Sequence, residues 1–308
     1  MNKQTEVLQE ASRVAGIDAV GVSNLLELNH FRNRFSLEKD RKTAFFKGEL
    51  QEKFDYHAIW NNTKSIISFA VGYYSDVEEP NDEKLRGKIS RCAWGEDYHV
   101  VLRRKADLFI HELKKSFGEF QSVIMIDNGV ISDRACAYTA GIGFYGKNGF
   151  IINPRLGSYL FLGTILTDLQ LKENEHFLLQ QCGACQLCLH SCPNQVLSES
   201  FGFDYEKCIS YQTQKGMDTD TKGWIYGCDI CQQICKFNHG IESGLHHEFD
   251  TEPLLAYPDI KELSEIDKEQ FDQRYAKSSL NWKGYRTIKR NSEQMMHRLN
   301  HDNNQKGE

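Results

Sequence analysis

Cysteine spacing constrains this 308-residue chain more than any other feature. In the segment CGACQLCLHSCP, gaps of two, two and three residues separate four cysteines, and a proline follows the last. In the run with this spacing, three thiolates hold one [4Fe–4S] cluster and the fourth crosses to a second cluster. Zinc is the alternative, but it is usually bound by two separated CxxC pairs. The spacing therefore favours two iron–sulfur clusters over a zinc site.

Eight of the ten cysteines lie between residues 182 and 235, which is the number that two four-iron clusters require. The crossing pattern assigns one cluster to Cys182, Cys185, Cys188 and Cys235. It leaves Cys192, Cys228 and Cys231 for the other, and Cys208 is the only nearby thiol left to complete that set. Cys208 is displaced upstream by a long insertion, which departs from a plain bacterial ferredoxin. Two clusters at this spacing would conduct single electrons.

The remaining composition is that of an ordinary globular protein. The formal net charge is −6, and 40% of the residues are hydrophobic. No apolar run has the length of a membrane span, and the N-terminus does not resemble a secretion signal. We therefore expect a cytoplasmic protein, without a membrane partner, in which clustered thiols serve metal binding and not disulfides.

Hydrophobic periodicity predicts helices and strands that alternate ahead of the cysteine-rich segment. The expected helices cover residues 5–16, 96–118 and 132–143. The expected strands cover residues 17–23, 65–74, 121–127 and 157–168. The chain is accordingly divided into an α/β or α+β domain over 1–175, a two-cluster ferredoxin-like domain over 176–240 and a helical C-terminal region with a polar tail over 241–308.

A glycine-rich block follows the third expected helix. Gly141 and Gly143 begin it, and Gly146 and Gly149 continue it, so the backbone could approach a flat or phosphorylated ligand closely. The letters GIGFYG begin like a dinucleotide fingerprint, but a helix precedes them and no strand leads into them. This context argues against a nicotinamide site.

Across these motifs the chain resembles the epoxyqueuosine reductases. The segments that carry the resemblance are ISRCAWGEDYH, SDRACAYTAGIGFYGKNGFII, GSYLFLGTILTD, CGACQLCLHSCP, CISYQT and GWIYGCDICQQIC. The resemblance implies base-off cobalamin in the N-terminal domain, two [4Fe–4S] clusters, and reduction of epoxyqueuosine to queuosine at the wobble position of tRNA. The tRNAs are those for aspartate, asparagine, histidine and tyrosine, and the reaction is the last step of queuosine synthesis.

The resemblance also implies roles for single residues. Removing an epoxide oxygen as water needs a positioned acid, and Asp133 matches the proposed donor of the family. Its alternative role is to favour a helix N-terminus. Asp127 is the fallback donor, with a turn role as its alternative. Lys147 and Asn148 match a motif near the corrin, against the alternative of a solvated turn.

Other residues receive weaker predictions. Ser210 lies two residues beyond Cys208 and could contact the cofactor, although a surface hydroxyl is an equal alternative. Three residues are expected to be structural, with neither metal nor catalytic roles: Cys92, His99 and Cys136.

A tRNA partner requires local positive charge on a chain of net charge −6. The C-terminal segment 282–298 is basic, and Trp282 and Tyr285 add stacking surfaces. A solvated helix face is the alternative. The predicted phosphate contacts are Lys283, Arg286, Lys289 and Arg290.

We further expect a monomer and an external low-potential electron donor. Two other functions remain open from the sequence. One is a cobalamin-dependent reductase of a small molecule, similar to a dehalogenase. The other is a ferredoxin-type electron carrier without catalysis.

Overall fold

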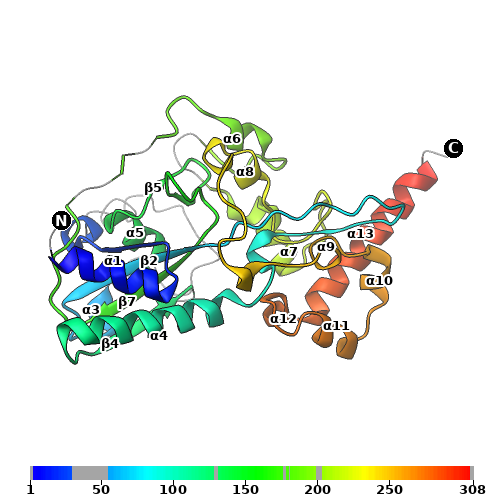
Figure 1. The fold of residues 1–308 in the computed structure, drawn as a ribbon. Coiled ribbons are helices and arrows are strands. Elements are labelled where there is room, and N and C mark those ends of the chain that lie inside the picture. The colour runs from blue at the N-terminus through cyan, green and yellow to red at the C-terminus, as the bar shows by residue number, and fades with distance from the viewer. Residues whose placement is uncertain are drawn as a thin grey trace. The chain divides into compact units, whose positions relative to one another are not determined.

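The computed structural model describes residues 3–29, 55–127, 131–175, 178–179, 181–198 and 203–305. The chain forms two compact units, and each is assembled from separate segments (Figure 1). The first unit contains Met1–Gly72, His99–Gln186 and Lys236–Ile241. The second contains Tyr73–Tyr98, Leu187–Cys235 and Glu242–Glu308. These units are defined by contacts between residues and not by order along the chain. They therefore do not test the predicted domain boundaries at 175 and 240, which stay predictions.

The first unit is built on a four-stranded sheet in the order β1-β2-β7-β4. Every neighbouring pair of strands is antiparallel, so the fold is α+β in kind. The strands are β1 (Ala19–Val22), β2 (Ser65–Gly72), β4 (Ser122–Ile126) and β7 (Leu160–Thr167). They lie within the ranges that the periodicity predicts.

Helices cover this sheet because its central strands are apolar on both faces. All eight residues of β2 are buried. The helix α5 packs against β2 and β7, and Ala135 and Cys136 join Ile66 and Leu166 in one apolar cluster. The long helix α4 runs beside the sheet in Figure 1. The other elements are α1 (Lys3–Ala15), α3 (Tyr56–Ile59), α4 (Tyr98–Phe117), α5 (Asp133–Thr139), β5 (Phe144–Tyr145), β6 (Ile151–Ile152) and a 3₁₀ turn, Lys236–Asn238.

The second unit is mostly helical, as predicted for the C-terminal region. The strands β3 (Lys88–Ile89) and β8 (Trp224–Tyr226) pair in parallel within it. Its core joins Trp94 and Ile225 to Phe271 and Ile288. The helices are α6 (Leu187–Ser191), α7 (Ile209–Lys215), α8 (Ile230–Gln233), α9 (Pro253–Ala256), α10 (Ile260–Glu265), α11 (Lys268–Arg274), α12 (Leu280–Lys283) and α13 (Tyr285–Gln305). Short 3₁₀ turns cover Arg91–Ala93, Tyr205–Lys207 and His247–Phe249.

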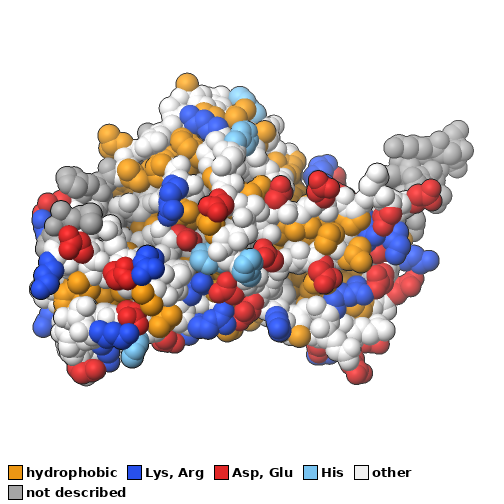
Figure 2. Space-filling view, in the orientation of Figure 1, with side chains coloured by type: hydrophobic (Ala, Val, Ile, Leu, Met, Phe, Trp, Pro, Cys, Tyr) orange, Lys and Arg blue, Asp and Glu red, His pale blue; other side chains and the backbone are white. Residues whose placement is uncertain are grey.

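The surface carries both signs of charge. Figure 2 shows Lys and Arg mixed with Asp and Glu over the face that it draws. This mixture fits the modest net charge of −6. None of the helices among the described residues is long and apolar enough to cross a membrane.

Candidate active site

Asp133 lies where a helix begins on top of the sheet. It is the first residue of α5, and the side chain of Ser132 caps the helix by accepting the Ala135 N–H. On the central strand β7, Thr164 is fully buried, and its Oγ1 donates to Asp133 Oδ1 over 2.9 Å. The carboxylate is half-buried. A side chain of the central strand therefore holds one carboxylate oxygen of Asp133. No local sequence pattern predicts this hydrogen bond.

Cys136 lies one turn further along α5 and is fully buried. Burial first, and then the charge of Asp133, raise the pKa of its thiol far above the ordinary value. A thiol in this state stays protonated and unreactive. The structural role expected for Cys136 fits this position.

Asp127 occupies a strained turn at the end of β4. Its φ is +54°, a conformation that aspartate tolerates better than most residues. Its Oδ2 lies 3.5 Å from Nε2 of His99, at the start of α4. The positive φ fits the turn role that the sequence gives as the alternative for Asp127, which stays a prediction, and His99 is paired with a carboxylate.

The glycines of the block differ in their surroundings. A Cβ at Gly143 or Gly146 would lie 2.5 Å from atoms of Ile152, so internal packing accounts for both glycines. A Cβ at Gly149 would meet only Arg134 Nη1, at 3.9 Å. The backbone at Gly149 thus borders open space, which fits the edge of a large flat ligand. Gly141 has a φ of +74° and serves the turn after α5.

Lys147 and Asn148 form a turn whose side chains are hydrogen-bonded to the protein. The ammonium of Lys147 donates to the carbonyl oxygens of Gly183 (2.8 Å) and Cys185 (3.1 Å). Asn148 is only 4% exposed, and its Oδ1 accepts the N–H of Phe150. Lys147 is therefore directed at the loop that carries the first two clustered cysteines.

The four thiols predicted for the second cluster influence one another within the second unit. Burial, Asp229, Cys208 and Cys192 together raise the pKa of Cys228 to about 12. Burial, followed by Cys228 and Cys208, raises the pKa of Cys231 well above its usual range. The thiols are thus close enough for their charges to interact.

These thiols are not arranged as ligands of a single metal ion. Among the described residues, no group of three or more Cys, His, Asp or Glu side chains is arranged to hold a single metal ion. A four-iron cluster binds each thiolate to a different iron, so its ligands stand farther apart than those of one ion. The all-thiol donor set fits such a cluster.

Ser210 contributes through its backbone. The N–H groups of Ser210 and Tyr211 donate to the thiol of Cys208, which favours its charged form, although burial raises the pKa overall. Ser210 is half-buried at the start of α7. The contact of Ser210 with the predicted cluster ligand is thus made by its backbone N–H.

A buried polar network beside Cys228 was not predicted. Asp229 is 1% exposed; it accepts the hydroxyl of Ser90 and, over 2.8 Å, the N–H of Arg91. The guanidinium of Arg91 lies 3.7 Å from the same carboxylate. Burial raises the pKa of Asp229, while the bonds from Arg91 and Ser90 oppose that rise. The sequence pattern that could have indicated this network is Asp229 itself, an acidic residue between the two cysteines of a CxxC pair.

The basic C-terminal stretch is partly bound to the protein itself. Lys289 Nζ donates to the carbonyl oxygen of Ile266 over 3.2 Å. The guanidinium of Arg290 covers Gly216, where an added Cβ would overlap it. Arg286 is exposed, and Trp282 is 59% exposed. The side chain of Lys283 lies outside the described residues.

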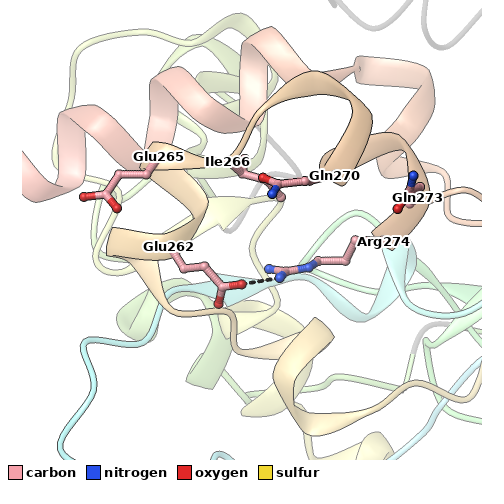
Figure 3. Close-up of a pocket in the computed structure, with 6 residues that line it drawn as sticks. All are labelled: Glu262, Glu265, Ile266, Gln270, Gln273 and Arg274. Atoms are coloured by element: carbon pink, nitrogen blue, oxygen red, sulfur yellow. Dashed lines mark hydrogen bonds and ion pairs between the residues drawn. The ribbon is translucent and has the colours of Figure 1, made fainter.

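One pocket of about 650 Å³ lies in the second unit (Figure 3). An ion pair between Arg274 and Glu262 spans it. Its walls come from α10, α11 and the turn between them, and contain no predicted site residue. None of the residues that line this pocket has a redox-active side chain.

The cysteine-rich segment matches a known domain. Residues 181–238 match the 4Fe-4S double cluster binding domain, and residues 53–128 match the family described as epoxyqueuosine reductase QueG, DUF1730. The match to a reductase family and the match to the double-cluster domain together define an iron–sulfur oxidoreductase.

Relatives extend the match over most of the chain. The epoxyqueuosine reductase of Lactococcus garvieae is 33% identical over 94% of this chain and 86% of its own. A structure of an epoxyqueuosine reductase with an epoxyqueuosine-modified tRNA-Tyr stem loop has a TM-score of 0.84 at 31% identity, over 94% of this chain and 79% of that one. The Bacillus subtilis enzyme, solved with an aspartate catalytic loop swung out of its active site, gives 0.84 at 30%, over 94% and 79%.

The chain belongs to the epoxyqueuosine reductase family, and its activity is that of an oxidoreductase. The resemblance seen in the sequence is thereby confirmed.

Proposed function

We propose that this protein reduces epoxyqueuosine to queuosine at the wobble position of tRNA in the cytoplasm. The observation that carries the proposal is family membership across 94% of the chain, through both the sheet unit and the cysteine-rich segment. The relative bound to a modified tRNA stem loop supports tRNA as the partner.

The reaction sets what the chain must provide. Converting the epoxide to an alkene breaks two C–O bonds and consumes two electrons and two protons, and the oxygen leaves as water. When bound, two [4Fe–4S] clusters and base-off cobalamin supply single electrons and a metal that acts on carbon. An external low-potential donor supplies the electrons. The chain itself must hold these groups, bind the tRNA and deliver a proton.

Asp133 delivers a proton to the departing oxygen. Because Thr164 donates to Oδ1, that oxygen is an acceptor, and the transferable proton resides on Oδ2. Thr164 is buried on a central strand, so the direction of the carboxyl group is fixed before substrate binds. The relative with an aspartate catalytic loop supports an aspartate in this role. Asp127 is less suitable because it faces His99.

The thiols hold the clusters in the two sets that the spacing predicts. The second set is supported because the charges of Cys192 and Cys208 act on Cys228, and those of Cys228 and Cys208 act on Cys231; Cys188 of the first set also acts on Cys231. The first set, with Cys182, Cys185, Cys188 and Cys235, rests on the spacing.

The corrin lies along the glycine-rich loop in this proposal. The open border at Gly149 supports a flat ligand there. Gly143 packs against Ile152, so its role in this proposal is to allow the loop to fold closely on itself. The predicted contacts are Asp133, Gly141, Gly143, Lys147, Asn148 and Ser210.

The tRNA contacts lie on the C-terminal helices. Exposure of Arg286 and Trp282 supports a phosphate contact and a stacking surface at the start of α13 and in α12. Lys283, Lys289 and Arg290 complete the predicted set.

Mass analysis of nucleosides tests the proposal. The reconstituted protein is incubated anaerobically with epoxyqueuosine-containing tRNA and a low-potential reductant, and the tRNA is then digested. We expect a nucleoside lighter by one oxygen atom, formed roughly 10² to 10⁴ times more slowly by Asp133→Asn at equal cofactor content. An unchanged nucleoside with fully loaded protein would refute the proposal.

A further inference from the structure

Lys147 makes two hydrogen bonds to one short loop 36 residues away in the sequence. Its ammonium donates to the carbonyl oxygens of Gly183 and Cys185, at 2.8 and 3.1 Å. These carbonyls belong to the CGAC segment, whose Cys182 and Cys185 are two predicted ligands of one cluster. All of these residues lie in the first unit.

Both sides of this contact have a defined shape. In the lysine loop, the Gly149 N–H donates to the Gly146 carbonyl (2.9 Å) and the Gly146 N–H to the Phe150 carbonyl (2.8 Å). In the cysteine loop, the Cys185 N–H donates to the Cys182 carbonyl (3.0 Å), and Gly183 has a φ of +55°. That conformation suits glycine and turns the loop sharply.

The contact is also strong for its kind. An ammonium has three donors and no acceptor, so two of the three are committed to this loop. Bonds from a charged donor are about twice as strong as neutral ones. Lys147 is half-buried, which reduces solvent screening of its charge. The side chain therefore acts as a charged brace.

We propose that Lys147 is a positioning residue that braces the Cys182–Cys185 loop and raises the reduction potential of the cluster bound there. The inference rests on the proposed function, because it takes that cluster to be [4Fe–4S]. Reduction adds one negative charge to the cluster, and a fixed cation nearby stabilises the reduced form. Net charge and hydrogen bonding around such clusters set their potentials.

The test compares three variants of the full chain, reconstituted anaerobically without substrate. Lys147→Met removes charge and hydrogen bonds, Lys147→Gln keeps a donor without the charge, and Lys147→Arg keeps the charge. Lys172→Met, which removes an exposed lysine of the same unit, is the control. Redox titration followed by electron paramagnetic resonance gives both cluster potentials, and a chelator gives the rate of iron loss.

We expect Lys147→Met to lower one of the two potentials and leave the other unchanged. At a fixed potential, the ratio of reduced to oxidised cluster should fall about tenfold, or 59 mV for a one-electron couple. About half of the iron should leave faster. Lys147→Gln should restore slow iron loss but not the potential, and Lys147→Arg should restore both.

Two results would overturn the inference. Unchanged potentials and iron loss in Lys147→Met would exclude the brace. A loss of corrin affinity with unaltered clusters would assign Lys147 to the corrin alone. Failure of the proposed function is a separate result, because wild-type protein without two [4Fe–4S] signals would show it before any variant is compared.

Discussion

At the scale of single residues, a substitution of Asp133 distinguishes two roles for this side chain: catalytic acid, or first residue of a helix without a catalytic role. Asp133→Asn keeps the size of the side chain and removes the transferable proton. We expect turnover to fall by roughly 10² to 10⁴, the usual contribution of a positioned acid. Cluster content, corrin binding and tRNA affinity should stay normal, as measured by metal analysis, absorption and filter binding. Turnover near that of wild type would move the acid role away from Asp133.

Thr164 tests whether the direction of that carboxyl group matters. Thr164→Val keeps the shape but removes the hydroxyl that donates to Asp133 Oδ1. Since misplacing a catalytic group by about 1 Å can cost about 10²-fold, we expect a loss of roughly 10- to 100-fold in kcat. Thr164→Ser keeps the donor and should recover most of the rate. If serine and valine were equally slow, packing and not the hydrogen bond would explain the loss.

Cys136 gives a prediction about pH. Burial and the charge of Asp133 raise its pKa in the folded protein, whereas an unfolded thiol titrates near about 8.5. Native Cys136 therefore stays protonated at pH 9, and its contribution to stability declines as pH rises above about 8.5. Mass spectrometry after alkylation at pH 9 should find Cys136 labelled only in denaturant. The half-buried Cys92 is the internal comparison. Equal labelling of both in native protein would contradict this prediction.

At the scale of elements, the displaced thiol before α7 decides the second cluster. Cys208→Ser should lower the iron content from roughly eight to roughly four per chain, because two four-iron clusters need eight thiolates. Cys92→Ser, which alters a half-buried thiol of the same unit, should keep all eight. Iron and acid-labile sulfide analysis checks both variants. Full iron in Cys208→Ser would require another ligand for the second cluster.

Elements with a local cause could be predicted from the sequence. The strands β2 and β7 and the helix α4 lie within their expected ranges, because alternation and helical periodicity are properties of neighbouring residues. The spacing within CGACQLCLHSCP is likewise a local pattern, whereas Cys208, Cys228, Cys231 and Cys235 are distant from it in the sequence, and the ligand sets stay predictions. The order of the strands was not predictable, because pairing joins distant segments.

The site contacts depend on such distant pairs. Thr164 reaches Asp133 across 31 residues, and Arg91 reaches Asp229 across 138. No periodicity encodes either contact. Glycine shows a second limit: Gly143 and Gly149 look alike in the sequence, yet one is packed and the other borders open space. Sequence alone does not distinguish a glycine that admits a ligand from one that admits a neighbouring side chain.

At the scale of the whole molecule, the net charge of −6 opposes the binding of tRNA, which is also negatively charged. Local charge therefore decides tRNA binding, and Arg286 is its exposed candidate. Arg286→Glu should weaken binding and lower the log–log salt slope by about 0.7 to 0.9 for a lost phosphate contact. Arg104→Glu, on an exposed position of α4, changes the net charge by the same amount and should leave the slope unchanged. Titration at several salt concentrations measures both slopes. Equal slopes for Arg286→Glu and wild type would remove this contact.

The interleaving of the two units has a consequence for synthesis of the protein on the ribosome. The first unit needs Lys236–Ile241, and the second needs segments up to its C-terminal helix. All eight clustered cysteines therefore leave the exit tunnel before either unit has its full set of segments. The nascent chain passes through a stage in which the thiols are made but their surroundings are incomplete. We therefore expect iron insertion to follow that stage, once residues 236–241 have joined the first unit, and not to take place on a free-standing ferredoxin module.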